Sequence, residues 1–419
     1  MKSFAYISLG CKVNSYESNA LADQLKREGY VLDDINPDVA FINTCSVTST
    51  ADQKSRQHIR KLINNYPNAI VVVMGCYSQG HHKFIKEEIK PAIIVGTSNR
   101  SELLKLIKEY EKSGVPIDLT ESNPRLYNYE ELGITSYSEQ ARAYLKIEDG
   151  CDNFCSYCLI PYVRGRTRSR DFDECVKEAT ALVDNGYKEI VLTGIHIGGY
   201  GKDLENTNFS KLTKALLDIK DLHRLRISSI EESEIDDMLI KLINERDNLA
   251  KHFHIPLQSG AAAILKAMNR KYTKEQFLNK LRLIRKACPN VALTTDVIVG
   301  FPGETEEDFV ETYNFIKECD FNMLHVFPYS LREGTVAAKM KNQIDTRIKK
   351  ERCLRLIELS NELWDKYTDK FIGSEVEVLI EQYDAKNSVN IGHTTNYLEV
   401  KIPGKPLPVG SVIKTVYKK

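Results

Sequence analysis

Three cysteines lie within eight residues in the stretch Cys151-Asp-Asn-Phe-Cys155-Ser-Tyr-Cys158. Three thiolates are one more than a single disulfide uses and one fewer than a tetrahedral metal site needs. They suit a 4Fe–4S cube in which the protein holds three irons and the fourth is open to a ligand. A zinc knuckle with a distant fourth ligand is the alternative, because short cysteine-rich tracts also bind zinc.

Three further cysteines, Cys11, Cys45 and Cys76, are dispersed through the first hundred residues, and each follows a strand-like apolar run. The carboxyl ends of parallel strands share one edge of an open sheet, where ligands bind. The pattern therefore predicts that these three thiols converge and form a second three-thiolate site. The alternative is that each is a small core residue. The other four cysteines, Cys175, Cys288, Cys319 and Cys353, have no partners at ligand spacing and are interpreted as packing residues.

The elements that must carry the dispersed cysteines alternate between strand and helix. Strands are expected at residues 4–9, 39–43, 69–74 and 92–95, and helices at 16–27, 50–64, 81–89 and 101–110. This rhythm predicts a doubly wound parallel sheet. Asn14 and Glu17 are expected to stiffen the first loop by capping the helix that follows it.

Regular periodicity fails between residues 113 and 140, which we interpret as a linker that partly covers the site. From Arg142 the strand–helix rhythm resumes, with strands expected at 143–147, 189–192, 224–227, 252–256, 292–299 and 323–327. Helices are expected between them, for example at 172–184, 211–219, 274–288 and 306–318. Six such units predict a partial (β/α)6 barrel whose working face is formed by the loops after the strands.

Polar and glycine-rich motifs fall on those loops. Gly194 opens a glycine-rich turn after the second strand, where the backbone could approach a ligand closely. Ser229 and Glu231 follow the third strand, and Gln258 follows the fourth. Asp296 lies inside an otherwise apolar strand and needs a partner or a ligand to offset its desolvation. For each of these residues a satisfied structural polar group is the alternative, and neither His196 nor His254 is given a catalytic task.

Local basic stretches stand out because the 419-residue chain has no net charge. Four arginines within seven positions, among them Arg164 and Arg166, follow the cysteine loop and predict contacts to phosphate. Intramolecular pairing with acidic residues is the alternative. After residue 372, β-branched residues alternate with polar ones, and the last twenty residues hold five lysines and no acids. A small β-barrel with a basic side fits loop RNA binding, with Lys405 and Lys414 as candidate contacts.

Several motifs together resemble the radical S-adenosylmethionine (SAM) methylthiotransferase family. They are the Cys-x3-Cys-x2-Cys loop with Tyr157 before its third cysteine, Gly10-Cys11-Lys-Val-Asn14, Asn43-Thr-Cys45-Ser-Val-Thr48, Gly75-Cys76-Tyr-Ser-Gln79 and the five barrel loops. The C-terminal segment is similar to a short TRAM domain, an RNA-binding module. The resemblance implies a methylthiotransferase domain at 1–112, a linker at 113–140, a radical SAM domain at 141–371 and a TRAM-like domain at 372–419.

The resemblance also implies two 4Fe–4S clusters. Cys151, Cys155 and Cys158 would hold the one that binds SAM and releases a 5′-deoxyadenosyl radical, and Cys11, Cys45 and Cys76 would hold an auxiliary cluster that carries sulfur. One SAM would supply a methyl group and a second SAM the radical, so that a substrate C–H becomes C–S–CH3. Tyr157, Gly194, Ser229, Glu231, Gln258 and Asp296 are the candidate SAM-binding residues.

Within the family, the motifs around Cys11 and Cys45 are most similar to the branch that modifies N6-threonylcarbamoyladenosine beside the tRNA anticodon. Sibling branches act on isopentenyladenosine in tRNA or on an aspartate of a ribosomal protein. A metal-containing RNA-binding protein without turnover is the alternative from another class. The expected partners are the tRNA anticodon loop, a reduced electron donor such as flavodoxin or ferredoxin, and a sulfur donor. A cytoplasmic location without a membrane is expected, since no apolar run is long enough to span a bilayer.

Overall fold

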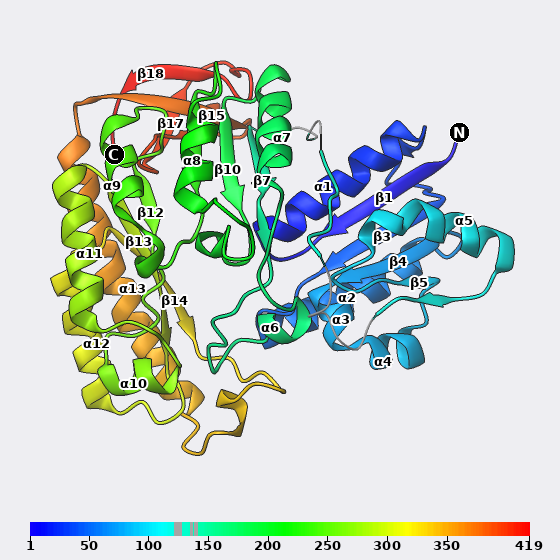
Figure 1. Cartoon of the computed structure of the whole chain (residues 1–419), viewed down its shortest axis with the longest axis horizontal. Helices are drawn as coiled ribbons and strands as arrows, with labels where there is room; N and C mark the ends of the chain where they lie inside the picture. Colours follow the sequence, from blue (N-terminus) through cyan, green and yellow to red (C-terminus); the bar gives the residue numbers. More distant parts are fainter. Residues whose placement is uncertain (121–127, 135–136, 138–140) are drawn as a thin grey trace.

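The structure, a computed structural model, describes residues 1–120, 128–134, 137 and 141–419. An N-terminal α/β domain lies beside a curved array of strands and helices, and a C-terminal antiparallel sheet covers one end of that array (Figure 1). The predicted linker lies partly outside the described residues. Strand β6 (Ile117–Asp118), which falls within it, pairs with the N-terminal sheet.

The N-terminal domain contains a six-stranded parallel sheet in the order β2-β1-β3-β4-β5-β6. Its other strands are β1 (Ser3–Ser8), β2 (Val31–Leu32), β3 (Val39–Thr44), β4 (Ile70–Gly75) and β5 (Ile93–Ile94). Its helices are α1 (Lys12–Arg27), α2 (Ser49–Asn65), α3 (Cys76–Gly80), α4 (His82–Phe84) and α5 (Leu103–Ser113), with a π-helical turn at Ile85–Ile89. The predicted doubly wound sheet is confirmed.

Two helix starts show how the loops beside the cysteines are held. The Thr48 side chain caps α2 by accepting a hydrogen bond from the N–H of Ala51. Cys11 occupies the cap position of α1 and makes no side-chain cap bond. The expected capping by Asn14 and Glu17 is therefore wrong, because both side chains are buried and bond to other partners.

The middle of the chain forms the predicted partial barrel of six parallel strands. They are β7 (Arg142–Lys146), β10 (Glu189–Thr193), β11 (Arg224–Ile227), β12 (His252–His254), β13 (Ala292–Val299) and β14 (Met323–Pro328). Backbone hydrogen bonds join them as β11-β10-β7 and β12-β13-β14, and parallel bridges link Leu225 to Leu249 and Ser229 to His254. All six strands and their order agree with the expectation from the sequence.

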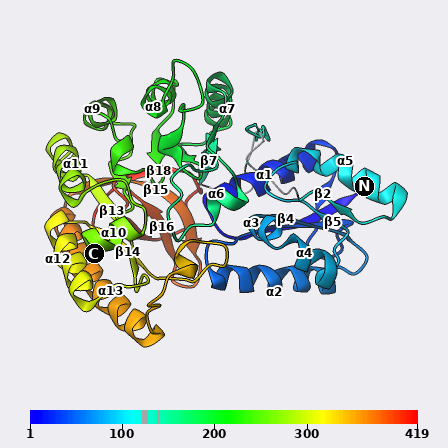
Figure 2. The same ribbon diagram turned by 60° about the horizontal axis from the view of Figure 1, so that its bottom comes forward.

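Helices cover the outside of these strands in an arc (Figure 2). The longer ones are α7 (Phe172–Asp184), α8 (Phe209–Leu217), α9 (Asp237–Glu245), α11 (Lys274–Ala287), α12 (Glu306–Cys319) and α13 (Thr346–Thr368), and α10 (Ala262–Ala267) is short. Their apolar faces and the strands enclose one large core, in which Cys175 and Cys319 are fully buried. Cys288 and Cys353 pack at its margin, which agrees with the interpretation of all four as packing residues.

The N-terminal domain contacts both edges of the partial barrel. On the β7 side, Tyr16 and Ala20 of α1 belong to the barrel core, and the Tyr16 hydroxyl donates to Glu178 of α7. On the β14 side, the following loop reaches the start of α2, where the Ser49 N–H donates to Ser330 Oγ at 3.1 Å. The domain therefore spans the opening between the first and last barrel strands.

The cysteine loop is fastened at its base by a two-stranded antiparallel ribbon. Strand β8 (Glu148–Asp149) precedes the loop and pairs with β9 (Arg168–Ser169), which follows it. Between them, the short helix α6 (Ile160–Val163) packs on α3 of the N-terminal domain. The Thr97 hydroxyl donates to the Val163 carbonyl at 2.6 Å, which ties the loop to that domain.

The C-terminal segment is a curled antiparallel sheet rather than a closed barrel. Its strands are β15 (Glu375–Asp384), β16 (Val389–His393), β17 (Glu399–Pro403) and β18 (Val412–Val416), in the order β17-β16-β15-β18. In the described part of the chain the two edge strands do not pair, so the sheet forms half a barrel. Its concave apolar side packs on Tyr367 of α13 and on Ala292 at the start of β13, which replaces the missing half.

Charged residues fix this sheet to the amino-terminal end of the barrel. Glu189, the first residue of β10, is fully buried and pairs with Arg142, Arg224 and Arg226 at 3.0, 3.0 and 2.7 Å. Burial opposes ionisation of Glu189, but the three arginines outweigh it and lower its pKa to about 2. Arg226 also donates to the Thr394 and Thr395 carbonyls and lies 4.3 Å from the Tyr397 ring centroid.

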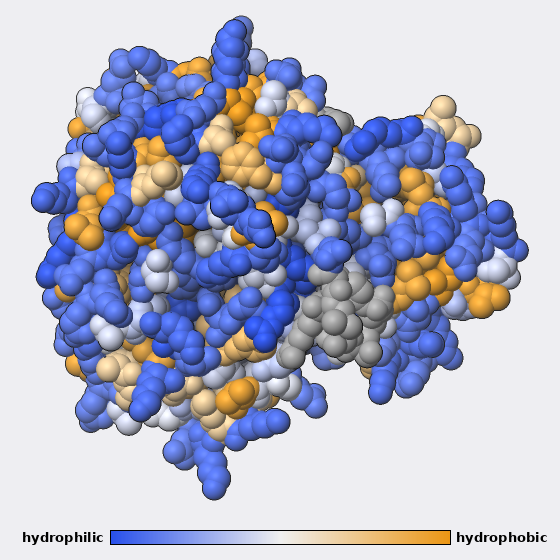
Figure 3. All heavy atoms as spheres, viewed as in Figure 1, coloured by the Kyte–Doolittle hydropathy of each residue, from blue (hydrophilic) through white to orange (hydrophobic). Residues whose placement is uncertain are grey.

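The face of the molecule in Figure 3 is mainly hydrophilic, with apolar patches scattered over it. None of the helices in the described ranges combines the length and the apolar character that crossing a lipid bilayer requires.

We expect Glu189→Gln to destabilise the protein by about 3–5 kcal/mol, because it removes the carboxylate that the buried Arg224 and Arg226 share with the partly buried Arg142. Thermal unfolding followed by circular dichroism should show a clear drop in Tm. Glu245→Gln, which alters an exposed carboxylate 3.9 Å from Lys241, is the control and should leave Tm nearly unchanged. Equal Tm values for the two variants would contradict this account of the junction.

Candidate active site

Three cysteines from the N-terminal domain meet at one sheet edge, as the sequence predicts. Strands β1, β3 and β4 are neighbours; Cys45 and Cys76 directly follow β3 and β4, and Cys11 lies three residues after the end of β1. Cys11 is exposed, whereas Cys45 and Cys76 are buried. Burial raises the pKa of Cys76 to about 11; Arg164 opposes this rise and the other two sulfurs add to it. These three residues are called the sheet-edge triplet below.

Backbone geometry leaves no spare room around this triplet. A Cβ on Gly10, whose φ is +96°, would lie 2.6 Å from the Cys45 sulfur. A Cβ on Gly75, whose φ is +100°, would lie 2.3 Å from Asn43 Oδ1. Glycine is therefore required at both positions, because only glycine adopts this conformation without strain and without these overlaps. Ser55 fixes Cys45 itself, since its hydroxyl accepts from the Cys45 N–H and donates to the Cys45 carbonyl.

The second group, Cys151, Cys155 and Cys158, lies on the loop between β8 and α6 and is called the loop triplet. Each of its sulfurs faces an N–H donor. Cys151 accepts from the backbone N–H of Asn153 at 3.4 Å and Cys158 from the backbone N–H of Ile160 at 3.4 Å. Cys155 accepts from the Arg270 guanidinium at 3.6 Å. N–H groups directed at cysteine sulfur stabilise thiolate ligands and tune iron–sulfur clusters.

The two triplets approach each other across the domain interface. Cys76 is the first residue of α3, and α3 packs on α6, which begins two residues after Cys158. Burial raises the pKa of Cys158 to about 12, and Cys155 and Cys76 add to the rise although the Ile160 N–H opposes it. The Cys76 and Cys158 sulfurs therefore lie close enough to influence each other's charge.

The donor chemistry fits two iron–sulfur clusters. Across the described ranges, no three His, Cys, Asp or Glu side chains converge on a point where a single metal ion could sit. A cubane cluster makes a different demand, because each of its irons takes one thiolate. Two sets of three thiols, each on constrained backbone and each with N–H donors to sulfur, meet that demand better than they meet a mononuclear zinc site.

Arg164, predicted as an RNA contact, is instead at the centre of a buried charge cluster between the domains. This cluster comprises Glu17, Arg100, Lys146, Asp149 and Arg164, all at most 1% exposed. Glu17 accepts from Arg100, Lys146 and Arg164 at 2.5, 2.8 and 2.9 Å, and Asp149 accepts from Lys146 and Arg164. The RNA prediction for Arg164 is wrong and the alternative of intramolecular pairing holds, because a fully buried guanidinium cannot reach a phosphate.

The described part of the linker lies over the buried charge cluster. Glu130 accepts from Arg100 Nε at 2.9 Å, and the Tyr129 hydroxyl donates to the Lys146 carbonyl at 2.8 Å. Despite its burial, Glu17 keeps a pKa well below the usual range because Arg100, Arg164 and Lys146 surround it. The cluster is therefore held in its ionised state from both domains and from the linker.

A cavity of about 240 Å³ opens between the two cysteine-bearing loops. Val47 and Thr48, which follow Cys45, form one wall, and Tyr157, Gln258 and Asp296 form the wall on the barrel side. Three of the predicted cofactor residues are thus brought together. Asp296 finds the partner that the sequence required, since His254 Nε2 lies 3.2 Å from its carboxylate.

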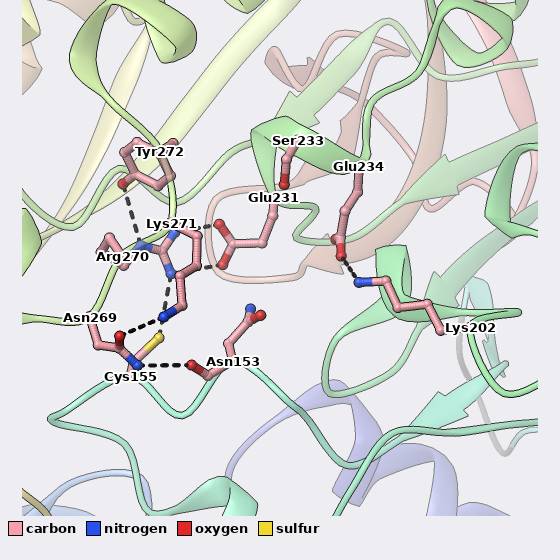
Figure 4. Close-up of a pocket in the computed structure, with 10 residues that line it drawn as sticks. All are labelled: Asn153, Cys155, Lys202, Glu231, Ser233, Glu234, Asn269, Arg270, Lys271 and Tyr272. Carbon is pink, nitrogen blue, oxygen red and sulfur yellow. Dashed lines mark hydrogen bonds and ion pairs between the residues drawn. The ribbon is translucent and has the colours of Figure 1, made fainter.

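Glu231 lines a different cavity, of about 230 Å³, beside Cys155 (Figure 4). Its carboxylate forms a two-point ion pair with Arg270, and one of the two contacts measures 2.9 Å. The same guanidinium donates to the Pro256 carbonyl and to Cys155 and stacks over Tyr272. Glu231 and Arg270 therefore form one unit next to the loop triplet.

Gly194 and Ser229 lie at the carboxyl ends of β10 and β11, on the expected face. A Cβ on Gly194 would lie 2.9 Å from the Glu148 carboxylate and from Ile197, so tight packing already requires glycine there. Burial raises the pKa of Glu148 well above its usual range, and one of its oxygens has no partner among the described residues. Ser229 is exposed next to the His254 backbone.

The other predicted RNA contacts are accessible. The Arg166 side chain is 55% exposed and pairs with Asp152 at 3.0 Å, beside the loop triplet. Lys405 is exposed, and Lys414 lies 3.7 Å from Glu375 with most of its side chain in solvent. Lys414 lies in β18 of the C-terminal sheet and Lys405 in the loop before it, at the opposite end of the barrel from the two cysteine triplets.

Sequence reasoning missed two arginines of the site. Arg270 follows α10 in a stretch without a motif, and Arg332 lies in the loop after β14. Arg332 pairs with Asp52 at 2.7 Å, donates to Ser46 at 2.8 Å and lines the cavity between the loops. The signal was weak, since each is a single basic residue in a chain with 58 lysines and arginines.

Comparison with known proteins agrees with this architecture. Residues 145–316 match the radical SAM superfamily, and residues 3–96 match an uncharacterised protein family named UPF0004. Among solved structures, the radical SAM methyltransferase TsrM from Kitasatospora setae, with cobalamin and a 4Fe–4S cluster bound, superposes with a TM-score of 0.58. It covers 78% of this chain and 75% of its own at 14% identity, which establishes a shared fold.

Curated relatives match over nearly the full length. The threonylcarbamoyladenosine tRNA methylthiotransferase MtaB of Bacillus subtilis is 45% identical across 99% of this chain and 93% of its own. A tRNA-2-methylthio-N(6)-dimethylallyladenosine synthase of Alkaliphilus oremlandii is 36% identical across 98% and 89%. The chain therefore belongs to the radical SAM methylthiotransferase family. Its cofactors are SAM and two 4Fe–4S clusters.

We expect Gly75→Ala to displace Cys76 and to impair the auxiliary cluster, because the added methyl group overlaps Asn43 and Thr44. After anaerobic reconstitution the variant should bind about four irons instead of the about eight of two cubanes. Gly29→Ala is the matched control: its φ is +84° but nothing lies within 4 Å, so it adds only a strained backbone of about 1–2 kcal/mol. Full iron content in the Gly75 variant would refute the packing requirement.

Proposed function

We infer that this enzyme converts C2 of N6-threonylcarbamoyladenosine, next to the tRNA anticodon, to its 2-methylthio derivative. One structural observation carries the reaction type: the sheet-edge triplet and the loop triplet open on the same domain interface, with a cavity between their loops. Sulfur insertion needs the sulfur source and the radical source to reach one carbon atom, and this interface allows it. The choice of adenosine derivative rests on the full-length similarity to the Bacillus subtilis enzyme.

The sibling substrates are less well supported. The relative named for dimethylallyladenosine shares 36% identity, against 45% for the one named for threonylcarbamoyladenosine. Both names specify tRNA, which disfavours the ribosomal-protein aspartate. The alternative of an RNA-binding protein without turnover does not account for a radical SAM barrel with its loop triplet intact.

Cys151, Cys155 and Cys158 are assigned to the cluster that binds SAM, and Cys11, Cys45 and Cys76 to the auxiliary cluster. With SAM bound, the first cluster supplies the radical that removes hydrogen from the substrate, and the second carries the sulfur to be inserted. Among the candidate SAM contacts, Glu231 is oriented by Arg270, and Gly194 and Ser229 line the same end of the barrel.

The interdomain cavity is the proposed site at which the target base meets the cofactor. Tyr157 and Asp296 approach it from the barrel, with Asp296 oriented by His254. Gln258 adopts a left-handed backbone, with a φ of +64°, and is held by hydrogen bonds to Asp296 and Ile298. Val47 is 57% exposed and presents an apolar surface to the opening. A mainly apolar cavity with a few oriented polar groups suits a nucleobase.

The RNA contacts proposed here are Arg166 near the cavity and Lys405 and Lys414 on the C-terminal sheet. Because that sheet covers the amino-terminal end of the barrel, a bound tRNA would extend along the barrel from the cavity to the sheet. A reduced flavodoxin or ferredoxin and a sulfur donor complete the proposed set of partners, and the cytoplasm is the proposed compartment because tRNA and these donors occur there.

Deleting the gene should remove 2-methylthio-N6-threonylcarbamoyladenosine from bulk tRNA and leave unmethylthiolated N6-threonylcarbamoyladenosine in its place. Mass spectrometry of tRNA nucleosides measures both. The wild-type chain should restore the product, and a Cys151→Ala chain, which lacks one ligand of the SAM cluster, should not. Loss of the isopentenyladenosine product instead would overturn the substrate assignment and transfer it to the sibling branch.

Val47→Ser tests the cavity as the base-binding site. We expect KM for an anticodon stem-loop to rise about threefold to tenfold, because the variant loses apolar contact with the base. Iron content and SAM cleavage without RNA should stay unchanged. Val115→Ser removes a valine that is 61% exposed and lies outside the cavity, so its KM should equal that of the wild type. An equal rise of KM in both variants, or no rise in the Val47 variant, would show that this wall of the cavity does not bind the base.

A further inference from the structure

The contacts of Arg164 use every N–H of its guanidinium. Nε donates to the Cys76 sulfur at 3.2 Å, Nη1 donates to Glu17 at 2.9 Å and to Asp149 at 3.0 Å, and Nη2 donates to Asn14 at 2.8 Å and to Glu17 at 3.2 Å. The side chain is 0% exposed. Arginine is the only natural side chain that can satisfy these acceptors, because its planar guanidinium carries five N–H donors, whereas lysine offers three donors from a single point.

Arg164 also reaches the rest of the sheet-edge triplet through Asn14. The Asn14 amide donates to the Leu9 carbonyl at 2.7 Å and to the Thr44 carbonyl at 3.0 Å, while its oxygen accepts from Arg164. Leu9 follows the last residue of β1 and lies two residues before Cys11, and Thr44 is the last residue of β3 and directly precedes Cys45. Arg164 thus contacts Cys76 directly. Through Asn14 it also reaches the backbone that leads to Cys11 and Cys45.

The contacts cross the domain boundary. Arg164 follows α6 of the barrel domain, whereas Asn14, Glu17 and Cys76 belong to the N-terminal domain. Asp149, on β8, is its acceptor within the barrel domain. A residue from the domain that carries the loop triplet therefore donates a hydrogen bond to the sheet-edge triplet.

Buried ion pairing alone does not account for this arrangement. Arg226 is equally buried and satisfies its own carboxylate partner, Glu189, at the other end of the barrel, but it contacts no cysteine among the described residues. Arg164 directs one donor away from the carboxylates and onto sulfur. In a low-dielectric site a fixed positive charge and an N–H···S contact both stabilise added negative charge on an iron–sulfur cluster, which raises its reduction potential.

We propose that Arg164 is a positioning residue of the auxiliary cluster, which holds the three cysteines in register and raises the reduction potential of that cluster through its contact with Cys76. This inference rests on the assignment of Cys11, Cys45 and Cys76 as ligands under Proposed function. It gives the barrel domain direct electrostatic influence over the sulfur-carrying cluster.

The test is a redox titration of the anaerobically reconstituted full-length enzyme, followed by electron paramagnetic resonance. To separate the signals, the titration is repeated in a chain with Cys151, Cys155 and Cys158 replaced by Ala. Arg164→Gln should lower the midpoint potential of the auxiliary cluster and leave that of the loop-triplet cluster in place. Arg226→Gln, the matched loss of a buried arginine, should shift neither potential.

Arg164→Lys keeps the charge but loses the fork, so a partial downward shift is expected. This variant also decides the matter if Arg164→Gln fails to fold or to bind iron. Unchanged auxiliary potentials in a folded Arg164 variant with about eight irons would overturn the proposal for Arg164 while leaving the proposed function intact. A wild-type chain that binds only about four irons, or forms no methylthio product, would instead overturn the proposed function itself.

Discussion

Three cations and two carboxylates buried between the N-terminal domain and the barrel set the geometry on which the rest of the site depends. Glu17 and Asp149 are each shared by several cations, and no member of the buried charge cluster is accessible to water. Such a group contributes little net stability, because pairing mainly compensates for desolvation. Pulling these buried ions apart while they remain shielded from water would cost much free energy. One relative placement of the two domains is therefore strongly preferred.

That placement explains why two cysteine triplets 75 residues apart at their nearest members in sequence serve one reaction centre, as the positions of Cys76 and Cys151 show. Each triplet is fixed locally by other means: the sheet-edge triplet by neighbouring strand ends and two glycines, and the loop triplet by the β8–β9 ribbon. The charge cluster then aligns two rigid parts. Arg332 provides a second fastening on the far side of the cavity by pairing with Asp52 of α2.

Much of this architecture could be predicted because it depends on local periodicity. The barrel strands and the convergence of Cys11, Cys45 and Cys76 follow from apolar runs and from the shared edge of parallel strands. The role of Arg164 could not be predicted in this way: its acceptors on Glu17 and Cys76 lie 147 and 88 residues away, and a run of arginines looks the same whether it faces solvent or carboxylates. The prediction that the C-terminal segment closes into a small barrel was wrong for a similar reason. Its half-barrel packs on β13 and α13 of the radical SAM domain, which supply the apolar surface that the missing strands would have supplied.

The cavity between the cysteine loops has walls from both domains, and its volume of about 240 Å³ leaves no room for a stacked strand of RNA. Since the buried ions oppose any hinge between those walls, the enzyme gains little access by opening. The adenosine must therefore leave its stacked position in the anticodon loop and enter alone. Unstacking costs least for a base that is already unpaired. The RNA, and not the enzyme, therefore changes conformation on binding, and the enzyme can accept only an adenosine that lies in a flexible loop.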